Sequence, residues 1–372
     1  MENHVGALVS GATVGGGGQT GSPNRALSNW ATVSGGIDNR ADGVVATVSG
    51  GEHNAATAWR STVGGGSTNQ ATATGTTISG GEQNQATATH ATIGGGLHNL
   101  NQGPGSTIGG GNSNEITSFD ATIGGGFNNT VQNRWAAIGG GIHNRAYGDA
   151  ATIAGGNNNE VTGWDATIGG GAGNVVSGPG AVIAGGHSNE ASGFDAAIPG
   201  GSSNLAGGDY SFAAGRRAHT STPGTFVWAD STDADFWAGG SNQFVVRAAG
   251  GVGLGTGNPT EQLDVNGDTR IRGQTLYLGT SSPPAQIVTG YGYHAKDLEL
   301  IATDQQRYYA DSDATNADGV DPMFQWFMNG ATTAAADELM RLDENGDLWV
   351  ANGYKTFPID LAENFAASEP LA

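Results

Sequence analysis

The stretch ATIGGGFNNTVQNRW occupies residues 121–135, and AAIGGGIHNRAYGDA (136–150) and ATIAGGNNNEVTGWD (151–165) follow it without a gap. An Ala-Thr-Ile-Gly-Gly phrase therefore returns with a 15-residue period. If Ala31 is taken as position 1, the period runs unbroken to Tyr210, so residues 31–210 hold twelve repeats. Self-similarity at a short fixed period is typical of architectures in which each repeat buries its apolar face by stacking on its neighbours.

Several positions of the repeat carry nearly the same residue each time. Position 3 is always Val or Ile, positions 5 and 6 are always Gly-Gly, and position 9 is always Asn. Position 11 is small and apolar except at Asn101, and position 2 is mostly Thr. Stacked coils would turn each of these positions into a column of like residues, and Asn columns can form hydrogen-bond ladders.

The pattern predicts strands and excludes a helix. Two glycines in each repeat would cost a helix about 2 kcal/mol relative to Ala, whereas the alternation at positions 1–4 is typical of a strand. Gly-Gly ends this strand, the Asn at position 9 is expected to adopt a left-handed turn conformation, and positions 10–13 form a second, shorter strand. We therefore predict an all-β chain: a parallel, left-handed β-solenoid or β-roll of 15-residue coils, with twelve coils spanning roughly 58 Å.

Each coil has little to bury. One Val or Ile, one or two alanines and a small residue at position 11 give a modest apolar area, and stability scales with that area. We infer that the missing partner is another copy of the chain. Three rods about a common axis would bury a second face of each, so a homotrimer is expected, with twofold packing as the alternative.

The domain organisation follows from where the period holds. Residues 1–30 contain an imperfect copy and are expected to form an N-terminal cap or attachment coil, followed by the solenoid at 31–210. Residues 211–260 lose the spacing and are predicted to be the cap and junction. Residues 261–372 are predicted to form a small β domain, with strands near 298–302 and 323–328 and with hairpins at Asn266-Gly267 and Asn345-Gly346, a strong hairpin signal.

Composition removes several classes of protein. The net charge is −20 and lysine is nearly absent, which disfavours nucleic acid and anionic membranes as partners. Without cysteine there is no disulfide scaffold, thiol nucleophile or thiolate metal site. No apolar run reaches the length of a membrane span, and the N-terminal residues lack the pattern of a secretion signal. The expected location is extracellular or on the surface of a virion or other particle.

The run ATIGGGxxNxA, across about residues 12–215, resembles the head repeats of trimeric autotransporter adhesins. GGDYSFAAGRRA (207–218) is the most specific part of this resemblance, and GGVGLGTGNPTEQLDVNG (250–267) is similar to a junction phrase of phage tail fibres. The resemblance implies a homotrimeric β-roll fibre for adhesion or receptor binding. The family's repeat is slightly shorter, and its coiled-coil stalk and membrane anchor have no counterpart here. This difference favours a fibre on a phage tail or the baseplate of a contractile injection system.

Aromatic residues gather at one turn of the predicted coil, at positions 14 and 15, and three of them are followed by Asp. Aromatic stacking combined with carboxylate hydrogen bonds is a common way to hold sugars, so this edge is the candidate site for a surface glycan or protein receptor. The alternative is that it packs against neighbouring chains, where aromatics are enriched. The candidate residues are Trp30, Trp59, Phe119, Asp120, Trp135, Trp164, Asp165, Phe194 and Asp195, with Tyr210 on the same edge.

Metal and catalytic motifs are weak. His53, His98 and His143 share position 8 but would lie about 14 Å apart, too far to share a metal. No cofactor is expected. Calcium remains an alternative at three acidic loops, although turns favour the same residues. These loops contain Asp264, Asn266 and Asp268; Asp311, Asp313, Asn316 and Asp318; and Asp343, Asn345 and Asp347.

The sequence favours a structural, receptor-binding fibre without catalytic residues. A glycan-degrading tailspike, with carboxylates such as Asp120, Asp165 and Asp195 acting on a polysaccharide, is the second hypothesis. An ice-binding solenoid using the Thr column is the third. It ranks last because position 4 carries Ser, Gly, Ala or Pro rather than a second Thr.

Overall fold

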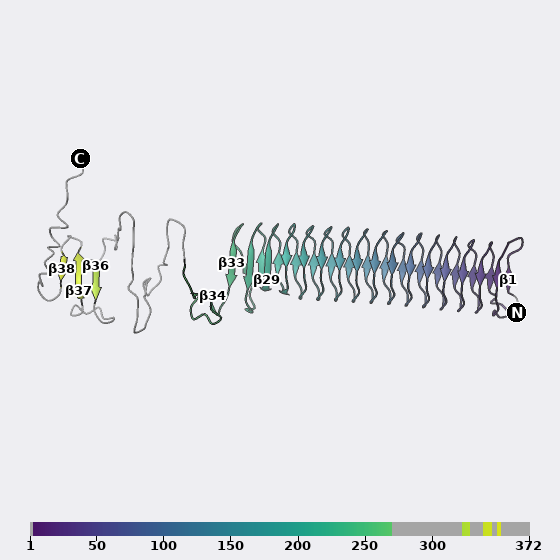
Figure 1. Cartoon of the computed structure of the whole chain (residues 1–372), viewed down its shortest axis with the longest axis horizontal. Helices are drawn as coiled ribbons and strands as arrows, with labels where there is room; N and C mark the ends of the chain where they lie inside the picture. The colour runs from purple at the N-terminus through teal and green to yellow at the C-terminus, as the bar shows by residue number, and fades with distance from the viewer. Residues whose placement is uncertain (1–2, 270–321, 328–337, 344–347, 351–372) are drawn as a thin grey trace, which may run out of the picture. The chain divides into compact units, whose positions relative to one another are not determined.

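The computed structural model describes residues 3–269, 322–327, 338–343 and 348–350, and these residues contain strands but no helix. The chain divides into two units, residues 1–270 and 271–372. The first unit is a parallel β-solenoid, seen in Figure 1 as a regular stack of coils from β1 to β33. The prediction of an all-β solenoid with 15-residue coils is therefore confirmed. Among the described residues, no helix is long and apolar enough to span a membrane.

Each coil contributes one short strand to each of two parallel sheets, here called sheet A and sheet B. Sheet A contains 16 strands, formed by positions 10 and 11 of the repeat. They are β1 (His4–Val5), β3 (Arg25–Ala26), β5 (Arg40–Ala41), β7 (Ala55–Ala56), β9 (Gln70–Ala71), β11 (Gln85–Ala86), β13 (Leu100–Asn101), β15 (Glu115–Ile116), β17 (Thr130–Val131), β19 (Arg145–Ala146), β21 (Glu160–Val161), β23 (Val175–Val176), β25 (Glu190–Ala191), β28 (Leu205–Ala206), β30 (Ala218–Thr220) and β32 (Phe236–Trp237).

Sheet B is formed by positions 2 and 3. Its strands are β2 (Thr13–Val14), β4 (Thr32–Val33), β6 (Thr47–Val48), β8 (Thr62–Val63), β10 (Thr77–Ile78), β12 (Thr92–Ile93), β14 (Thr107–Ile108), β16 (Thr122–Ile123), β18 (Ala137–Ile138), β20 (Thr152–Ile153), β22 (Thr167–Ile168), β24 (Val182–Ile183), β26 (Ala197–Ile198), β29 (Phe212–Arg216), β31 (Phe226–Ala229) and β33 (Phe244–Arg247), with the short β27 (Gly201–Ser202) beside β29.

Register is the same at every step of the repeat. Thr77 of β10 pairs with Thr92 of β12, and Ile78 pairs with Ile93, so identical positions lie directly above one another. Position 7 adds a third line of isolated parallel bridges, which begins at Ile37 and Glu52. Nearly every coil is thus hydrogen-bonded to the next along three lines.

The core consists of four inward columns. Positions 1, 3 and 11 supply mostly small or branched apolar side chains, and those from Ala31 to Ile198 are fully buried or within one per cent of it. Position 9 supplies the fourth column, and its asparagines, from Asn24 to Asn204, are equally buried. The interior is therefore narrow, and one of the four columns that line it is polar.

The buried asparagines satisfy one another and the backbone. The Asn144 N–H donates to the side-chain oxygen of Asn129 in the preceding coil at 3.0 Å. The Asn129 amide nitrogen donates to the Gly125 carbonyl in its own coil and to the Gly141 carbonyl in the next coil, both at 3.0 Å. A buried polar group is tolerated only when its hydrogen bonds are made, and this ladder meets that requirement at each coil.

The left-handed turn residue is not the Asn. Position 8, one residue earlier, has φ near +55°, as at Asp38 (53°), His53 (56°) and Thr68 (57°), and position 15 is left-handed too. The expectation for position 9 was wrong because the Asn side chain is required inside, where it forms the ladder, and extended backbone places it there. The turn conformation falls instead on an exposed position that accepts several residue types.

Position 6 is the glycine that the fold requires. Gly141 has φ of +91°, and a Cβ there would clash with the Gly156 carbonyl oxygen of the next coil. At the neighbouring Gly140 a Cβ would meet nothing within 4 Å. The Gly-Gly pair is therefore asymmetric: stacking requires a glycine at position 6, whereas a Cβ at Gly140 has open space around it.

The stack extends beyond the strict repeat at both ends. Thr13 of β2 pairs with Thr32 of β4, and Arg25 of β3 pairs with Arg40 of β5, so coils precede Ala31. After Tyr210, β29, β31 and β33 continue sheet B, where Phe226 pairs with Phe212 on one side and with Phe244 on the other. The first of these late coils is shorter than the repeat and the second is longer. Residues 211–247 thus add further coils with longer strands to the stack.

Two smaller sheets follow the stack. β34 (Val252–Leu254) pairs with β35 (Leu263–Val265) in parallel, just before the predicted Asn266-Gly267 turn. In the second unit, β36 (Pro322–Phe327), β37 (Glu338–Asp343) and β38 (Leu348–Val350) form an antiparallel sheet, and β37 and β38 flank the predicted Asn345-Gly346 turn. That turn, the predicted strand at 298–302 and the residues from 270 that would complete the first hairpin lie outside the described residues.

Candidate functional site

The residues of the predicted aromatic edge lie along one side of the solenoid. Its residues lie in the turn that leads from sheet A to sheet B, at positions 14 and 15 of successive coils. The turns are stacked by backbone hydrogen bonds, such as the one from Arg60 N–H to the Val44 carbonyl of the preceding coil at 3.0 Å. Position 15 is left-handed, with φ of 55° at Trp30, 58° at Trp135 and 56° at Tyr210. This conformation directs the side chains away from the core.

The aromatic side chains remain accessible although they touch. Trp135 is 55% exposed and Tyr210 is 66% exposed. Phe119 packs edge-on against Trp135 with ring centroids 6.3 Å apart. Phe194 bridges Trp164, at 6.3 Å, and Tyr210, at 5.7 Å. The edge therefore carries two aromatic clusters in its C-terminal half, each offering ring faces to solvent.

Trp30 and Trp59 lie on the same edge in the N-terminal half. Both are about half exposed, and the guanidinium of Arg60 lies over the Trp59 ring at 4.2 Å. A similar contact joins Arg134 to Trp135 at 4.7 Å, and Arg134 also forms an ion pair with Asp149 at 2.8 Å. At exposed sites such as these, a cation–π contact contributes about 0.5–1 kcal/mol.

Asp120, Asp165 and Asp195 occupy the left-handed position 15 directly after an aromatic residue, and all three are exposed. None of the three forms an ion pair within residues 3–269. Coil spacing separates Asp120 from Asp165 by about 14 Å and Asp165 from Asp195 by about 10 Å. Carboxylate pairs of glycoside hydrolases lie about 5–9.5 Å apart, so the arrangement suits hydrogen bonding to a ligand better than paired acid–base chemistry.

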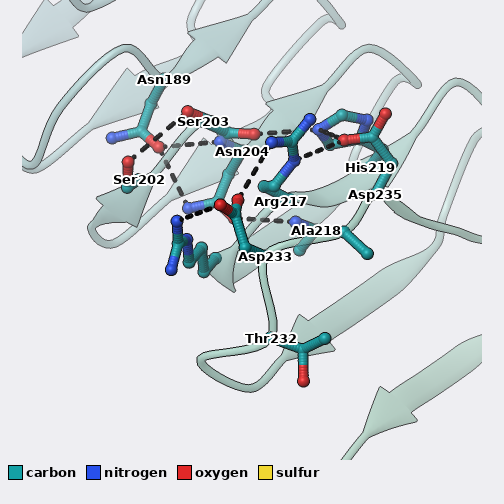
Figure 2. A network of polar contacts seen from close by, with 12 residues as sticks. Asn189, Ser202, Ser203, Asn204, Arg217, Ala218, His219, Thr232, Asp233 and Asp235 are labelled. Carbon is teal, nitrogen blue, oxygen red and sulfur yellow. Dashed lines mark hydrogen bonds and ion pairs between the residues drawn. The ribbon is translucent and has the colours of Figure 1, made fainter.

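A second polar constellation lies in the last coils, around Arg216 and Arg217 of the segment GGDYSFAAGRRA (207–218). Figure 2 shows Arg217 between two carboxylates: its Nε donates to Asp235 at 2.7 Å and its Nη1 donates to Asp233 at 3.1 Å. Arg216 also pairs with Asp233 at 2.9 Å. The three aspartates at 230–235 are the sequence feature from which these ion pairs could have been predicted, because they supply the carboxylates that the arginines contact.

Arg247 holds the same loop from the other side. Its Nε donates to Asp230 at 3.0 Å, and its terminal nitrogens donate to the carbonyls of Ala234 at 2.7 Å and Thr232 at 3.0 Å. Asp230, 16% exposed, also accepts the Ala249 N–H at 2.8 Å. These bonds fasten residues 230–235 across the end of the stack, so this constellation has a structural role.

Hydrogen bonds and neighbouring charges shift the pKa values of the ionisable groups in and around this loop. Hydrogen bonds from the Ala249 N–H, from Thr232 and from Arg247 hold the pKa of Asp230 far below its usual range. The hydrogen bond from Arg217 lowers the pKa of Asp235, and the Asp235 and Asp233 carboxylates raise the pKa of Arg217. All three groups therefore stay charged at neutral pH.

Asn204, the last Asn of the ladder, lies next to the coil that carries Arg217 and His219. Asn204 accepts the Ala218 N–H at 3.0 Å, and Figure 2 shows this bond next to Arg217 and His219. The His219 Nε2 lies 2.9 Å from the Ser203 carbonyl oxygen, and its ring meets Trp237 edge-on at 4.7 Å. The interior ladder thus ends directly beneath the charged loop.

Two of the remaining metal-site candidates, Asp264 and Asn266, have structural partners. Asp264 accepts the Thr260 N–H at 3.1 Å, and Asn266 donates to the Gly255 carbonyl at 3.1 Å, which are turn-forming contacts. No cluster of three potential metal ligands occurs among the described residues. Asp343 belongs to β37, whereas Asn345, Asp347, Asp311, Asp313, Asn316 and Asp318 lie outside the described residues.

His53, His98 and His143 occupy the left-handed position 8 on separate coils, each with φ of 56°. Ring nitrogens of His53 lie 3.2 Å from the Glu52 carboxylate and 3.7 Å from that of Asp38, and His98 contacts Gln83 of the preceding coil. The Phe127 and His143 rings lie 5.5 Å apart. These contacts join neighbouring positions and bring no two of the three histidines together.

No protein-family model matches this sequence, and a search of the curated proteins found no match.

Proposed function

We propose that the chain is the shaft and receptor-binding part of a fibre, a tail fibre or surface adhesin, assembled as a homotrimer and displayed outside the cell or on a particle. The observation that carries the proposal is the aromatic edge. Large rings are exposed at one turn of a long solenoid whose other regular positions are filled mostly by small or polar residues. A cluster of exposed apolar side chains is typical of a contact site for another molecule.

The solenoid suits the mechanical part of this function. Its coils are joined by three lines of parallel pairing and by the buried Asn ladder, so most backbone polar groups are satisfied. Sixteen strands at about 4.8 Å give sheet A a length of roughly 72 Å. A rod of this kind holds a binding surface at a fixed distance from its point of attachment, on a phage tail or the baseplate of an injection particle.

The edge suits recognition of a glycan. Phe194 joins Trp164 and Tyr210 into one apolar surface, and Asp165 and Asp195 lie beside it with exposed carboxylates. Stacking on the rings and hydrogen bonds to the carboxylates would together hold sugar units. Because the edge is acidic, its ligand is expected to be a neutral or amino-sugar polysaccharide rather than an acidic one.

Binding to arrayed surface polysaccharides tests the proposal. A Trp164→Ala/Tyr210→Ala variant is expected to lose at least tenfold in affinity for any polysaccharide that the native chain retains. Gln85→Ala, on sheet A and away from the edge, is the matched control. Native protein that binds no surface glycan or cell-surface protein, or an edge variant that binds as well as the control, would contradict the proposal.

The same assay separates the fibre from a tailspike. Release of reducing ends from the bound polysaccharide, abolished in an Asp165→Asn/Asp195→Asn variant, would show that the edge is catalytic. Binding without cleavage is the outcome that the carboxylate spacing favours.

A further inference from the structure

From β2 to β26, the outward face of sheet B is free of charge. Position 2 is Thr in every strand from β2 to β16, then Ala, Thr or Val up to β26, and position 4 is Gly, Ser, Ala or Pro throughout this range. Sheet A differs, because its outward position 10 carries Arg25, Arg40, Glu115, Arg145, Glu160 and Glu190. The two faces of one rod therefore present different surfaces: sheet A a charged one and sheet B a neutral, flat one.

Such a face is suited to contact with protein. Sheet faces that meet water normally carry polar and charged side chains, whereas depletion of charge is the compositional signal of an interface core. Small Thr, Ser, Gly and Ala side chains allow two sheets to approach to about 10 Å. Hydroxyl groups also cost less to remove from water than charged groups.

The C-terminal end of the same face is apolar. Phe212, Phe226 and Phe244 take over the Thr column and stack at ring distances of 4.6 Å at both steps. Trp228 takes over position 4 and is 39% exposed, while Phe244 is 75% exposed. We call these four residues the Phe–Trp anchor. They place a large apolar surface at one end of a face that otherwise carries small side chains.

The face is large enough for a stable contact. Its length from β2 to β33 is roughly 70 Å, and a strip about 10 Å wide along it offers on the order of 700 Å² per chain. Two such strips bury on the order of 1,400 Å², which falls within the range of specific interfaces, about 1,200–2,000 Å². Two outward residues per coil therefore provide enough area for a specific interface, because many coils contribute to it.

We propose that sheet B is the face through which copies of this chain pack side by side, parallel and in register, with the Phe–Trp anchors together at one end. This deepens the fibre proposed above, on which it rests, by naming the face that its chains bury. An antiparallel arrangement would set each anchor against the β2 end of its neighbour and leave the apolar rings without matching apolar surface. Parallel association places each residue opposite its own copies about an axis along the rod.

Charge placed on this face tests the proposal in the full-length chain. Thr92→Lys/Thr122→Lys puts like charges opposite one another in a parallel assembly, which is strongly unfavourable, so a dissociation constant at least tenfold higher is expected by sedimentation. Gln85→Lys on sheet A adds charge without facing the interface and should leave association unchanged. Circular dichroism checks that each variant keeps its β structure.

Cross-linking tests the register independently, because the chain has no cysteine. Thr122→Cys should be joined to Thr122→Cys of another copy by a short bismaleimide, whereas Gln85→Cys should not. A native chain that is monomeric at every concentration, or sheet A variants that dissociate or cross-link as readily as sheet B variants, would overturn the proposal. So would a monomer whose Thr face inhibits ice growth, with that activity lost in Thr92→Lys.

The two proposals fail separately. An oligomer that cross-links through Thr122→Cys but binds no surface glycan or protein supports the sheet B interface and contradicts the receptor-binding function. A monomer that binds a polysaccharide through the aromatic edge supports recognition and contradicts the interface.

Discussion

The side-chain oxygen of Asn129 accepts the backbone N–H of Asn144, one coil further along the chain, at 3.0 Å. The same Asn129 side chain donates to the carbonyls of Gly125 and Gly141. One buried side chain thus makes two hydrogen bonds to the next coil and one within its own coil. Because its neighbours do the same, the interior of the rod is held by a polar line as well as by an apolar one.

Replacing Asn129 by Ala is expected to destabilise the solenoid by about 2 kcal/mol or more. The change takes the side-chain partner from the Asn144 N–H and from the Gly125 carbonyl, and each buried group left unpaired costs about 1–3 kcal/mol. The Gly141 carbonyl keeps its bond from the Phe127 N–H. Denaturant unfolding measures the total, and hydrogen exchange at the Asn144 amide locates it.

The control for this prediction is Gln132→Ala, which removes an exposed side chain from the same coil. It should leave both the stability and the Asn144 exchange rate close to those of the native chain. An unchanged Asn144 exchange rate in Asn129→Ala would contradict the ladder.

The two glycines of one Gly-Gly pair should differ in how much stability they lose when changed to Ala. Gly141→Ala introduces a Cβ against the Gly156 carbonyl at φ of +91°, which should cost about 2–4 kcal/mol through strain and displacement of the next coil. Gly140→Ala, with open space around its Cβ, should be neutral within about 0.5 kcal/mol. Melting temperatures of the two variants decide the matter, and equal losses would show that the assignment of position 6 is wrong.

The irregular coil at Asn101 offers a test of coupling. Asn101 donates to the carbonyls of Thr92 and Ser106 at 3.0 Å, and the Ser106 hydroxyl donates to the Asn101 side-chain oxygen. Asn101→Ala alone should cost about 1–3 kcal/mol, since it removes the partner of buried groups. The double variant with Ser106→Ala recreates the alanine pair found at Ala86 and Ala91, so it should lose less than the sum of the single variants. Additive losses in denaturant unfolding would show that the pair is not coupled.

Acid should loosen the last coils before it affects the ladder. The pKa of Asp230 and of Asp235 is lowered in the folded chain, so both carboxylates stabilise the fold fully above the unfolded value of about 3.9. Their contribution declines as the pH falls below that value and is lost as it passes through the folded pKa. Hydrogen exchange at the Ala249 amide, corrected for its intrinsic pH dependence, should accelerate below about pH 4.

Two controls make the acid prediction specific. The Asn144 amide, bonded to a group that does not titrate, should keep its protection over the same range. Asp230→Asn should remove most of the pH dependence at Ala249. Equal acid sensitivity at Ala249 and Asn144 would assign the loss to the whole solenoid rather than to the loop at 230–235.

Much of the solenoid could be predicted from sequence because the period fixes both the register and the face of each residue. The Val/Ile column at position 3 and the small residues at position 11 were predicted to be stacked, and residues such as Ile153 and Ala146 are fully buried. The Asn column was predicted too, but with the wrong conformation. Position 8 varies among Asp, Asn, Gly, Ser, His, Thr and Gln, so residue type did not single out this position as the left-handed one.

Regions without the period were harder to predict. The coils after Tyr210 differ in length from the repeat, so they keep the pairing of β29, β31 and β33 while losing the spacing that reveals it. The partners of Arg247 are distant in sequence and become neighbours only through the stack. The aromatic edge was predicted as a line by counting alone, and whether it holds a receptor remains a prediction.

Identical cross-sections have a consequence for how the rod can change in length. Because each coil from 31 to 210 pairs with the next in the same register, a block of one whole repeat can be removed or duplicated there while every inward column stays continuous. Each such event would alter the reach of the rod by about 4.8 Å and leave its ends untouched. Loss or duplication of whole repeats in the gene would thus change the distance between the two ends of the rod without changing the sequence of either end.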